Sequence, residues 1–423
     1  MAMANNKNMV NPSNIVEGFN VLLKIYFSSE ETKFLNKEFT AEFRSVLEDK
    51  YSLTFNTAAD LPDESLNTEA IKFYIDKLIT FSENNLTPDK SYSFLYKLGD
   101  VAISLGEHRA AYDIYTSLIS RLRKSDGNES LLAYSMLALA NINARQANFD
   151  SSIKQTRNCI KLFEAQNDHV GIAKSENLIG TIYAEQGKPR PAKSHFQKGL
   201  AVLDDKHDKD TSAMFEVNLG ILYNITGKFD LSYTNFQRAL VKYEELKNYQ
   251  RVAEVRHNLG MVHLKKLQLD SALKEFDSSL SISLNHRFLP TLAITYISKG
   301  ELYALADDLT LATAYADKGL SVSYDINDEL TIADGYKIKG IIDRKKENYP
   351  SAENYLQSSL RINNQYENQL NYAESAFELG ILYKIQENIT SATEFLDVAL
   401  EYFKKIGNKF ETRRIKAILS ELR

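Results

Sequence analysis

The stretch Leu-Gly-Ile-Leu-Tyr occurs at residues 219–223 and again, unchanged, at residues 379–383. Three variants of it are IGTIY at 179–183, LGMVH at 259–263 and KGELY at 299–303. All five copies therefore keep the same phase of one 40-residue period. An internal repeat of this length is typical of a chain built from stacked, similar units.

Three columns of residues keep the same phase along the chain. The first column holds glycine, the second holds alanine seven positions earlier, and the third holds leucine twenty positions later. The glycines are Gly180, Gly220, Gly260, Gly300, Gly340 and Gly380, with Ala140 at the same phase. The alanines are Ala133, Ala173, Ala213, Ala253, Ala293, Ala333 and Ala373, and the leucines are Leu200, Leu240, Leu280, Leu320, Leu360 and Leu400. Agreement in three separate columns indicates a true repeat.

The residues around Gly220 indicate what one repeat is. Val217 and Tyr223 lie on either side of this glycine at helical spacing. Residues 226–228 then predict a short turn, and residues 229–243 again place apolar or small side chains at helical spacing. One repeat is therefore predicted to be two antiparallel helices that need neighbours to bury their apolar faces. Glycine would let the two backbones approach closely, against the roughly 1 kcal/mol that it costs inside a helix.

The same residues resemble the L-G-x-x-Y…A-x-x-x-F signature of tetratricopeptide repeats. The second half of the signature is matched by Ala192–Phe196, Ser232–Phe236 and Ala272–Phe276. An eighth copy, shifted by one residue, begins at residues 98–102 and continues with Ala111 and Tyr115. The resemblance covers about residues 90 to 407. It implies an all-α fold, a TPR-like α-solenoid in which antiparallel helix pairs form a right-handed superhelix.

Three features depart from the usual tetratricopeptide pattern. The chain has no tryptophan, its units lack the proline at their end, and each unit has 40 residues where about 34 is usual. The extra residues would lengthen the helices by nearly two turns. In this respect the repeats resemble those of LGN/Pins scaffolds, kinesin light chains and Rap-type peptide-responsive regulators. The resemblance implies a protein that works by binding other proteins.

The N-terminal part lies outside the 40-residue phase. Residues 1–13 are predicted to be disordered, and residues 14–88 are predicted to be helical. Within the second segment, helices are expected at 14–27, 31–52 and 66–84. They would form either a cap for the repeats or a small module with its own function, because a solenoid needs atypical ends.

The repeats and the C-terminal end follow. Residues 89–407 are predicted to hold eight tetratricopeptide-like repeats. Gly407 and Asn408 then form a helix-stop signal. Residues 408–423 are predicted to form one amphipathic helix that caps the last repeat.

Charge and cysteine content exclude several classes of protein. The net charge of −5 argues against nucleic acid, RNA included, as the partner. Cys159 is the only cysteine and cannot form an internal disulfide. Its apolar helical surroundings favour a buried side chain over a reactive thiol. The sequence also lacks a secretory signal and any run of about 18 apolar residues that could span a membrane, so a cytoplasmic location is expected.

Motifs of enzyme and metal sites are missing from the sequence. The seven histidines form no H-E-x-x-H pair, and there is no C-x-x-C, glycine-rich phosphate loop or G-x-S-x-G. The paired acids Asp307 and Asp308 fit a helix cap. We therefore expect no enzymatic activity, no cofactor and no metal.

The resemblance also implies which side chains line a binding groove, because the first helix of each tetratricopeptide unit lines the concave face. Three columns are expected to face the groove, at the positions three residues before, one residue after and five residues after each glycine. Two further columns, two residues before and four residues after the glycine, would lie beside them. These columns vary between repeats, which fits either a specific, non-repetitive partner or drift on a solvated face. The candidate peptide-binding residues are Asn177, Val217, Asn218, Ile221, His257, Asn258, Met261, Lys265, Lys337 and Arg344.

Asparagine and positive charge sharpen this hypothesis. Asn218 and Asn258 share the column two before the glycine. In long-repeat relatives an asparagine in this N-L-G setting often bonds a peptide backbone, because its amide both donates and accepts. The alternative is a local role on the helix surface. Lys265, Lys337 and Arg344 favour an acidic partner segment.

Two functions fit these features. The first is an interaction scaffold or adaptor that binds a peptide or an extended segment of a partner in the concave groove. The second is a peptide-sensing regulator whose N-terminal helices act on a partner protein.

Overall fold

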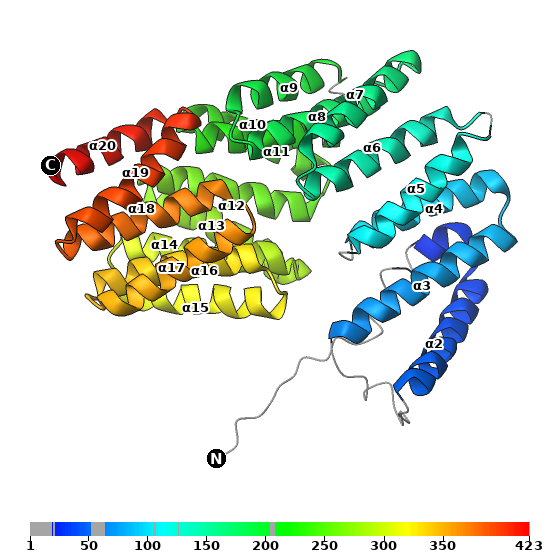
Figure 1. The fold of residues 1–423 in the computed structure, drawn as a ribbon, viewed down its shortest axis with the longest axis horizontal. Helices are drawn as coiled ribbons and strands as arrows, with labels where there is room; N and C mark the ends of the chain where they lie inside the picture. Colours follow the sequence, from blue (N-terminus) through cyan, green and yellow to red (C-terminus); the bar gives the residue numbers. More distant parts are fainter. Residues whose placement is uncertain are drawn as a thin grey trace. The chain divides into compact units, whose positions relative to one another are not determined.

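The structure is a computed structural model, and it describes residues 19, 22–51, 64–104, 107–125, 127–203 and 208–422. These residues form helices and short turns, and no strand occurs among them (Figure 1). The chain divides into two compact units, residues 1–175 and residues 176–423, and the boundary falls within α8 (His169–Glu185). The all-α prediction is confirmed.

The first unit contains the helices that precede the repeats and the first repeats. Its helices before α8 are α2 (Ser29–Tyr51), α3 (Glu64–Asn85), α4 (Pro88–Ser104), α5 (His108–Leu122), α6 (Glu129–Arg145) and α7 (Phe149–Ala165). The helices α2 and α3 occupy the places predicted at 31–52 and 66–84. Residues 22–26 of the helix predicted at 14–27 are helical. The predicted disordered segment 1–13 lies outside the described residues.

One apolar core runs through this unit. It begins at Phe19 and Leu23, continues through Leu35 on α2 and Tyr74 on α3, and reaches Tyr115 on α5. The helices before the repeats therefore bury their apolar faces against the first repeat rather than in a core of their own.

The second unit continues with helices in pairs. They are α9 (Pro189–Ala201), α10 (Lys209–Ile225), α11 (Phe229–Glu245), α12 (Tyr249–Lys265), α13 (Leu269–His286), α14 (Leu289–Leu305), α15 (Leu309–Asp325), α16 (Glu329–Lys345), α17 (Tyr349–Gln365), α18 (Gln369–Ile385), α19 (Ile389–Lys405) and α20 (Lys409–Leu422). Most of them are as long as α10, and from α10 onward a turn of three residues joins each helix to the next, except for two residues between α13 and α14. The 40-residue repeat is thus two half-repeats of equal length.

The turns follow one geometry with a 20-residue period. From residue 127 onward, a residue with positive φ ends each half-repeat whose turn is described, as at Gly227, Lys247 and Glu347. Around Gly227, the glycine N–H donates to Asn224 O at 3.0 Å and Lys228 N–H donates to Tyr223 O at 2.8 Å. This pair of bonds is the Schellman motif, which satisfies the last carbonyls of the helix. Ten of these positive-φ residues are not glycine, so the turns hold them in a conformation that L-residues disfavour.

The residue after each positive-φ position precedes the next helix. Asparagine or aspartate stands there in most half-repeats, and in seven of them the side chain accepts from the backbone N–H three residues on. Such bonds are made by Asp168, Asn248, Asp308, Asp328, Asn368, Asn388 and Asn408. They satisfy N–H groups that the helix itself leaves unpaired.

In six repeats, glycine marks the crossing of the two helices. A Cβ atom built on Gly220 would lie 2.6 Å from the ring of Phe236, and one on Gly260 would lie 2.4 Å from Phe276. The partner stands sixteen residues after the glycine in every case, and at Gly300 it is Ala316. The glycines at 220 and 260 therefore make room for a side chain of the second helix, whereas the predicted approach of the two backbones is seen at Gly300, where a Cβ would lie 3.2 Å from Ala312 O and Ala316 N.

The first helices of the pairs form the inner layer of the second unit. The helices α10, α12, α14 and α16 each contact the next first helix, whereas the second helices α11, α13, α15, α17 and α19 make few contacts or none with one another in the part of the chain described. The layer of first helices is therefore the tighter one, and the stack curves toward it.

The curvature brings the end of the chain back to an early turn of the same unit. The Asn408 side chain, which caps α20, donates from Nδ2 to Ile225 O at 3.0 Å. The rings of Phe229 and Phe410 meet edge to face, 5.8 Å apart. We call this the closing contact. It joins the α10–α11 turn to the α19–α20 turn, which are separated by 183 residues at the hydrogen bond.

We expect Gly220→Leu to lower the free energy of unfolding by roughly 1–3 kcal/mol or more, because its side chain would overlap the Phe236 ring. Urea unfolding followed by circular dichroism measures the loss. Thr234→Leu, on the exposed face of α11, is the control and should change little. Equal stability of both variants would contradict the packing role of the glycine column.

We expect opposite effects at two turn positions. Glu347→Gly should stabilise the protein by roughly 0.5–1 kcal/mol, because it relieves a non-glycine residue at φ 59°. Gly407→Ala should destabilise it by about the same amount, because a Cβ there meets no neighbour and only the backbone strain at φ 73° acts. Urea midpoints test both, and a shift of both in the same direction would contradict the argument.

Candidate functional site: a cavity on the inner face

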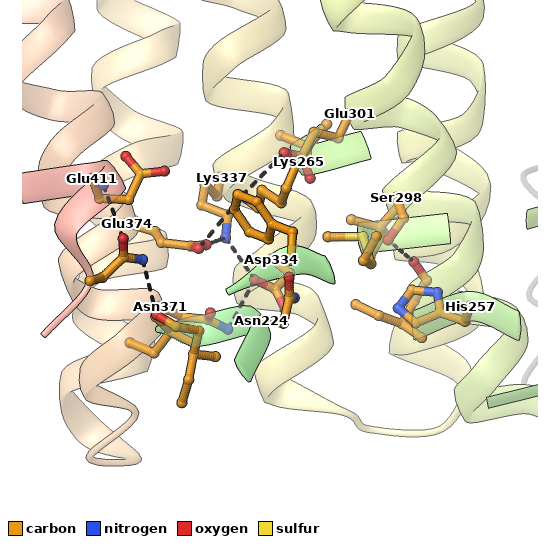
Figure 2. Close-up of a pocket in the computed structure, with 18 of the residues that line it drawn as sticks. Asn224, His257, Lys265, Ser298, Glu301, Asp334, Lys337, Asn371, Glu374 and Glu411 are labelled. Atoms are coloured by element: carbon orange, nitrogen blue, oxygen red, sulfur yellow. Dashed lines mark hydrogen bonds and ion pairs between the residues drawn. The ribbon is translucent and has the colours of Figure 1, made fainter. Parts of the chain in front are cut away.

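A cavity of about 270 Å³ lies on the inner face of residues 176–423 (Figure 2). Side chains of α12, α14, α16 and α18 line it, and the closing contact contributes Ile225 and Asn408. The cavity exists because successive first helices project the same stripe of residues inward. Its volume is near the lower end of ligand pockets, which measure about 300–1,000 Å³.

One part of the cavity wall is apolar. Met261, Ile294 and Ile297 come from α12 and α14, and Ile338 and Phe403 add to them from α16 and α19. Such a wall can bury an aliphatic or aromatic side chain, and that burial would supply most of the binding free energy.

The other part of the wall is a cluster of charged side chains. Lys337 Nζ lies 2.5 Å from Glu374 Oε2 and 3.2 Å from Asp334 Oδ1. Lys265 Nζ lies 3.8 Å from Glu374 Oε1 and 4.0 Å from Glu301 Oε1. The ion pairs thus connect α12, α14, α16 and α18 to one another (Figure 2).

The pKa values of these groups depend on burial and on their partners. Burial opposes ionisation of Glu374, but Lys337 and Lys265 outweigh it and hold the Glu374 pKa at about 2. For Glu301 and Asp334 burial dominates and raises the pKa, with the lysines opposing it in part. Of the three carboxylates, Glu374 is therefore firmly ionised, whereas Glu301 and Asp334 take up a proton more readily.

Two neutral polar residues also line the cavity. Burial lowers the pKa of His257 to about 4, so the imidazole is neutral at pH 7, and its Nδ1 lies 3.2 Å from Thr295 Oγ1. The Oδ1 atom of Asn224 is buried and has no hydrogen-bond partner among the described residues. A buried acceptor of this kind is costly unless a ligand or water satisfies it.

The structure brings four of the sequence-predicted site residues together. His257, Met261, Lys265 and Lys337 all line the cavity. The positive charge expected to attract an acidic partner is paired within the protein, because Lys265 and Lys337 contact acids. Arg344 Nη2 likewise lies 2.6 Å from Glu378 Oε2.

The other predicted residues lie elsewhere on the first helices. Asn218 donates from Nδ2 to Asn177 Oδ1 at 2.6 Å, so these two amides pair across adjacent helices. Val217 packs against the apolar core, and 42% of Ile221 is exposed. Asn258 is half-buried and does not line the cavity.

Several lining residues were not among the predicted site residues. Ile294, Asp334 and Glu374 share the column six before the glycine, one helical turn beyond the columns taken from the resemblance. Extending the inward stripe by one turn would have found them. Asn408 and Phe403 could not be found in this way, because the closing contact brings them to the cavity.

Comparison with known families gives the class of the repeats. The tetratricopeptide repeat model matches residues 132–205 and 210–285. These segments are tetratricopeptide repeats, as the L-G-x-x-Y pattern predicted. No curated protein matches the chain in sequence.

Solved structures extend the likeness to the fold. A Rap protein complexed with Competence and Sporulation Factor aligns with a TM-score of 0.60 at 15% identity, over 93% of this chain and 100% of its own. Aspartyl phosphate phosphatase F from Bacillus subtilis aligns with a TM-score of 0.53 at 13% identity, over 97% and 98%. A Rap conjugation gene regulator of the plasmid pLS20, in complex with the Phr* peptide, has a TM-score of 0.55 at 16% identity, over 78% and 97%. The fold is therefore a tetratricopeptide-like solenoid of the kind found in Rap proteins.

Within the described residues, no three histidine, cysteine, aspartate or glutamate side chains are grouped so as to hold a metal ion. None of the helices described is both long and apolar enough to cross a membrane.

We expect Glu374→Gln to lower the free energy of unfolding at pH 7 by roughly 2–3 kcal/mol, because Lys337 and Lys265 lose their shared carboxylate. The Glu374 pKa of about 2 lies below its ordinary 4.5. Its stabilisation is therefore present above pH 4.5 and disappears as the pH falls toward 2. The difference in the free energy of unfolding between the variant and the wild type should therefore become smaller as the pH falls over that range.

Urea unfolding at a series of pH values measures this gap. Glu401→Gln, at an exposed position of α19, is the matched control and should show no gap. A gap for Glu374→Gln that stays constant down to about pH 2 would rule out the paired carboxylate as its cause.

Proposed function

We propose that the protein is an interaction scaffold that binds a peptide, or an extended segment of a partner protein, along the inner face of its first helices. The cavity carries this proposal, because it combines an apolar wall with polar groups and with the unpaired Asn224 acceptor. One side chain of the segment would enter the cavity as an anchor, and Asn224 would accept a hydrogen bond from the segment. No catalytic step is part of the proposal, and we place the protein in the cytoplasm.

The rest of the segment would extend along α10 and α12. Asn218 and Asn258 lie on these helices, and Asn177 is bonded to Asn218. A peptide backbone can replace the Asn177–Asn218 bond without leaving either amide unpaired, because each amide both donates and accepts. Support for a peptide also comes from the fold, since two structures of similar fold are complexes with the Competence and Sporulation Factor and with the Phr* peptide.

The charge around the cavity bears on the kind of segment. The wall contains the cations Lys265 and Lys337 and the acids Glu301, Asp334, Glu374 and Glu411. An acidic segment, as expected from the lysines and Arg344 in the sequence, would compete with these acids for their partners. The excess of acids supports a neutral or basic anchor instead.

The test begins with a selection of peptides of about ten residues from a random display library on the intact protein. The affinity of an enriched peptide is then measured by calorimetry. Ile294→Trp fills part of the cavity and should weaken binding at least about tenfold, because the anchor is excluded. Ser281→Trp, exposed on α13, is the control and should leave the affinity unchanged.

A second pair of variants tests the asparagines. Asn218→Ala with Asn258→Ala should weaken binding by roughly 10²–10⁴-fold if both amides bond the peptide backbone. The control pair is Gln237→Ala with Lys274→Ala on the second helices α11 and α13. Full affinity in the Ile294→Trp variant would overturn the proposed site, and full affinity in the Asn pair would remove its extension along α10 and α12.

A second candidate is a peptide-sensing regulator whose N-terminal helices act on a partner protein. The helices before the repeats are included in the similarity to aspartyl phosphate phosphatase F, which covers 97% of this chain. Their surface also exposes 59% of Ile25 and 63% of Phe34, which a partner could bury. If the Phe34→Ser variant no longer binds a partner protein but still binds the peptide, this second function is favoured.

A further inference from the structure

A second hollow lies beside the closing contact, at the α8–α9, α10–α11 and α19–α20 turns of residues 176–423. It is a groove of about 1030 Å³, and the N-termini of α9, α11 and α20 border it. We call it the basic groove, because its described lining contains basic side chains and no acidic one. Its basic residues are Lys188, Arg190, Lys193, Lys228, Lys404, Lys405 and Lys409.

The charges in the basic groove are not compensated. Among the described residues, no acid forms an ion pair with any of the seven, in contrast to Lys265 and Lys337 at the cavity. Their polar partners are neutral, since Lys188 Nζ donates to Gln186 Oε1 at 2.9 Å. Lys228 Nζ lies 5.9 Å from the centre of the Tyr223 ring. Positive charge therefore accumulates where three turns meet.

The sequence departs from its own capping pattern at this place. The position before each helix is usually asparagine or aspartate, but it is lysine at 188 and 228. From residue 128 onward, no other half-repeat has lysine at this position. Neither lysine makes a side-chain capping bond. Lysine has no acceptor, and its charge repels the positive end of the helix dipole. Local helix stability does not explain these two lysines, whereas an anionic ligand does.

The turns of the basic groove are also built to lie close together. They end in Gly187, Gly227 and Gly407, which have positive φ, where most other turns use larger residues. A Cβ on Gly227 would lie 2.8 Å from Asn408 Oδ1, which is too close, whereas one on Gly187 would be in ordinary contact with the Lys405 side chain at 3.4 Å. Glycine at 227 therefore permits the approach of the α10–α11 and α19–α20 turns, which brings their like charges together.

We propose that the basic groove binds an acidic, partly apolar peptide segment of a partner protein, at a site separate from the inner cavity. Carboxylates of the segment would pair with the lysines and with the helix N-termini. Pro189, Pro191 and Phe410 also line the groove, and 50% of Phe410 is exposed, so apolar side chains of the segment would cover them. A bound segment would join the turns of the closing contact and would stabilise it.

Two other anions fit the groove less well. A single phosphate would leave most of the volume and the apolar side chains unused. A nucleic acid would meet a protein whose net charge is −5. An acidic peptide matches both the charge and the apolar lining.

The experiment measures the fluorescence anisotropy of a labelled peptide of about ten residues in which glutamate alternates with leucine and phenylalanine. The groove variant carries Lys188→Gln, Lys228→Gln and Lys409→Gln. The control variant carries Lys247→Gln, Lys274→Gln and Lys416→Gln, with the same change in charge at exposed positions. Wild type and control should bind the peptide, and the groove variant should bind at least about tenfold more weakly at low salt.

Thermal unfolding tests whether the groove variant folds. Its Tm should not fall below that of the wild type, because the removed lysines repel the helix N-termini. Equal affinity of the groove variant and wild type would overturn the proposal. So would equal binding of a peptide with glutamine in place of glutamate, or tighter binding of a single-stranded oligonucleotide of the same charge. Loss of binding in Ile294→Trp with full binding in the groove variant would place the peptide in the inner cavity and would also overturn it.

Discussion

In the six repeats with a glycine at the 40-residue phase, the contact between this glycine and the residue sixteen positions later fixes how the two helices pack. At Gly220 and Gly260 the partner is a phenylalanine ring that lies where a Cβ would be. At Gly300 the partner is Ala316, and there the backbones themselves are close. Because this contact fixes how the two helices cross, it also fixes which stripe of the first helix faces inward. The positions of the cavity residues follow from it.

The inner face and the basic groove use charge in opposite ways. At the cavity, Lys337 forms ion pairs with Glu374 and Asp334, so its charge is compensated within the protein and connects α16 to α18. Burying such pairs seldom adds much net stability, but breaking one is costly, so they fix how the helices are arranged. In the basic groove the lysines have no acidic partner among the described residues. The two surfaces therefore suit ligands of different charge.

The sequence predicted the helix pairs and the positions where they cross, because both recur with the 40-residue period. Of the predicted site residues, only His257, Met261, Lys265 and Lys337 line the cavity. The turn at 226–228 was predicted, but the geometry that all the turns share was not, because the positive-φ position is glycine at 227 but lysine at 247 and glutamate at 347. The pairing of Lys337 with Glu374 was also not found, since it joins residues on different helices whose distance depends on the curvature of the stack. The part of the cavity formed by Asn408 depends on the closing contact, which no local pattern encodes.

The closing contact also limits how this protein can evolve. An open solenoid tolerates the gain or loss of whole units, because each unit touches only its neighbours. Here Asn408 bonds the carbonyl of Ile225, and both residues sit on turns whose positions depend on every repeat between them. Duplication or deletion of one 40-residue unit would shift the α19–α20 turn relative to the α10–α11 turn, and the closing contact could not form. The number of units between α10 and α20 is thus fixed by geometry, and variation should be confined to point substitutions and to the ends of the chain.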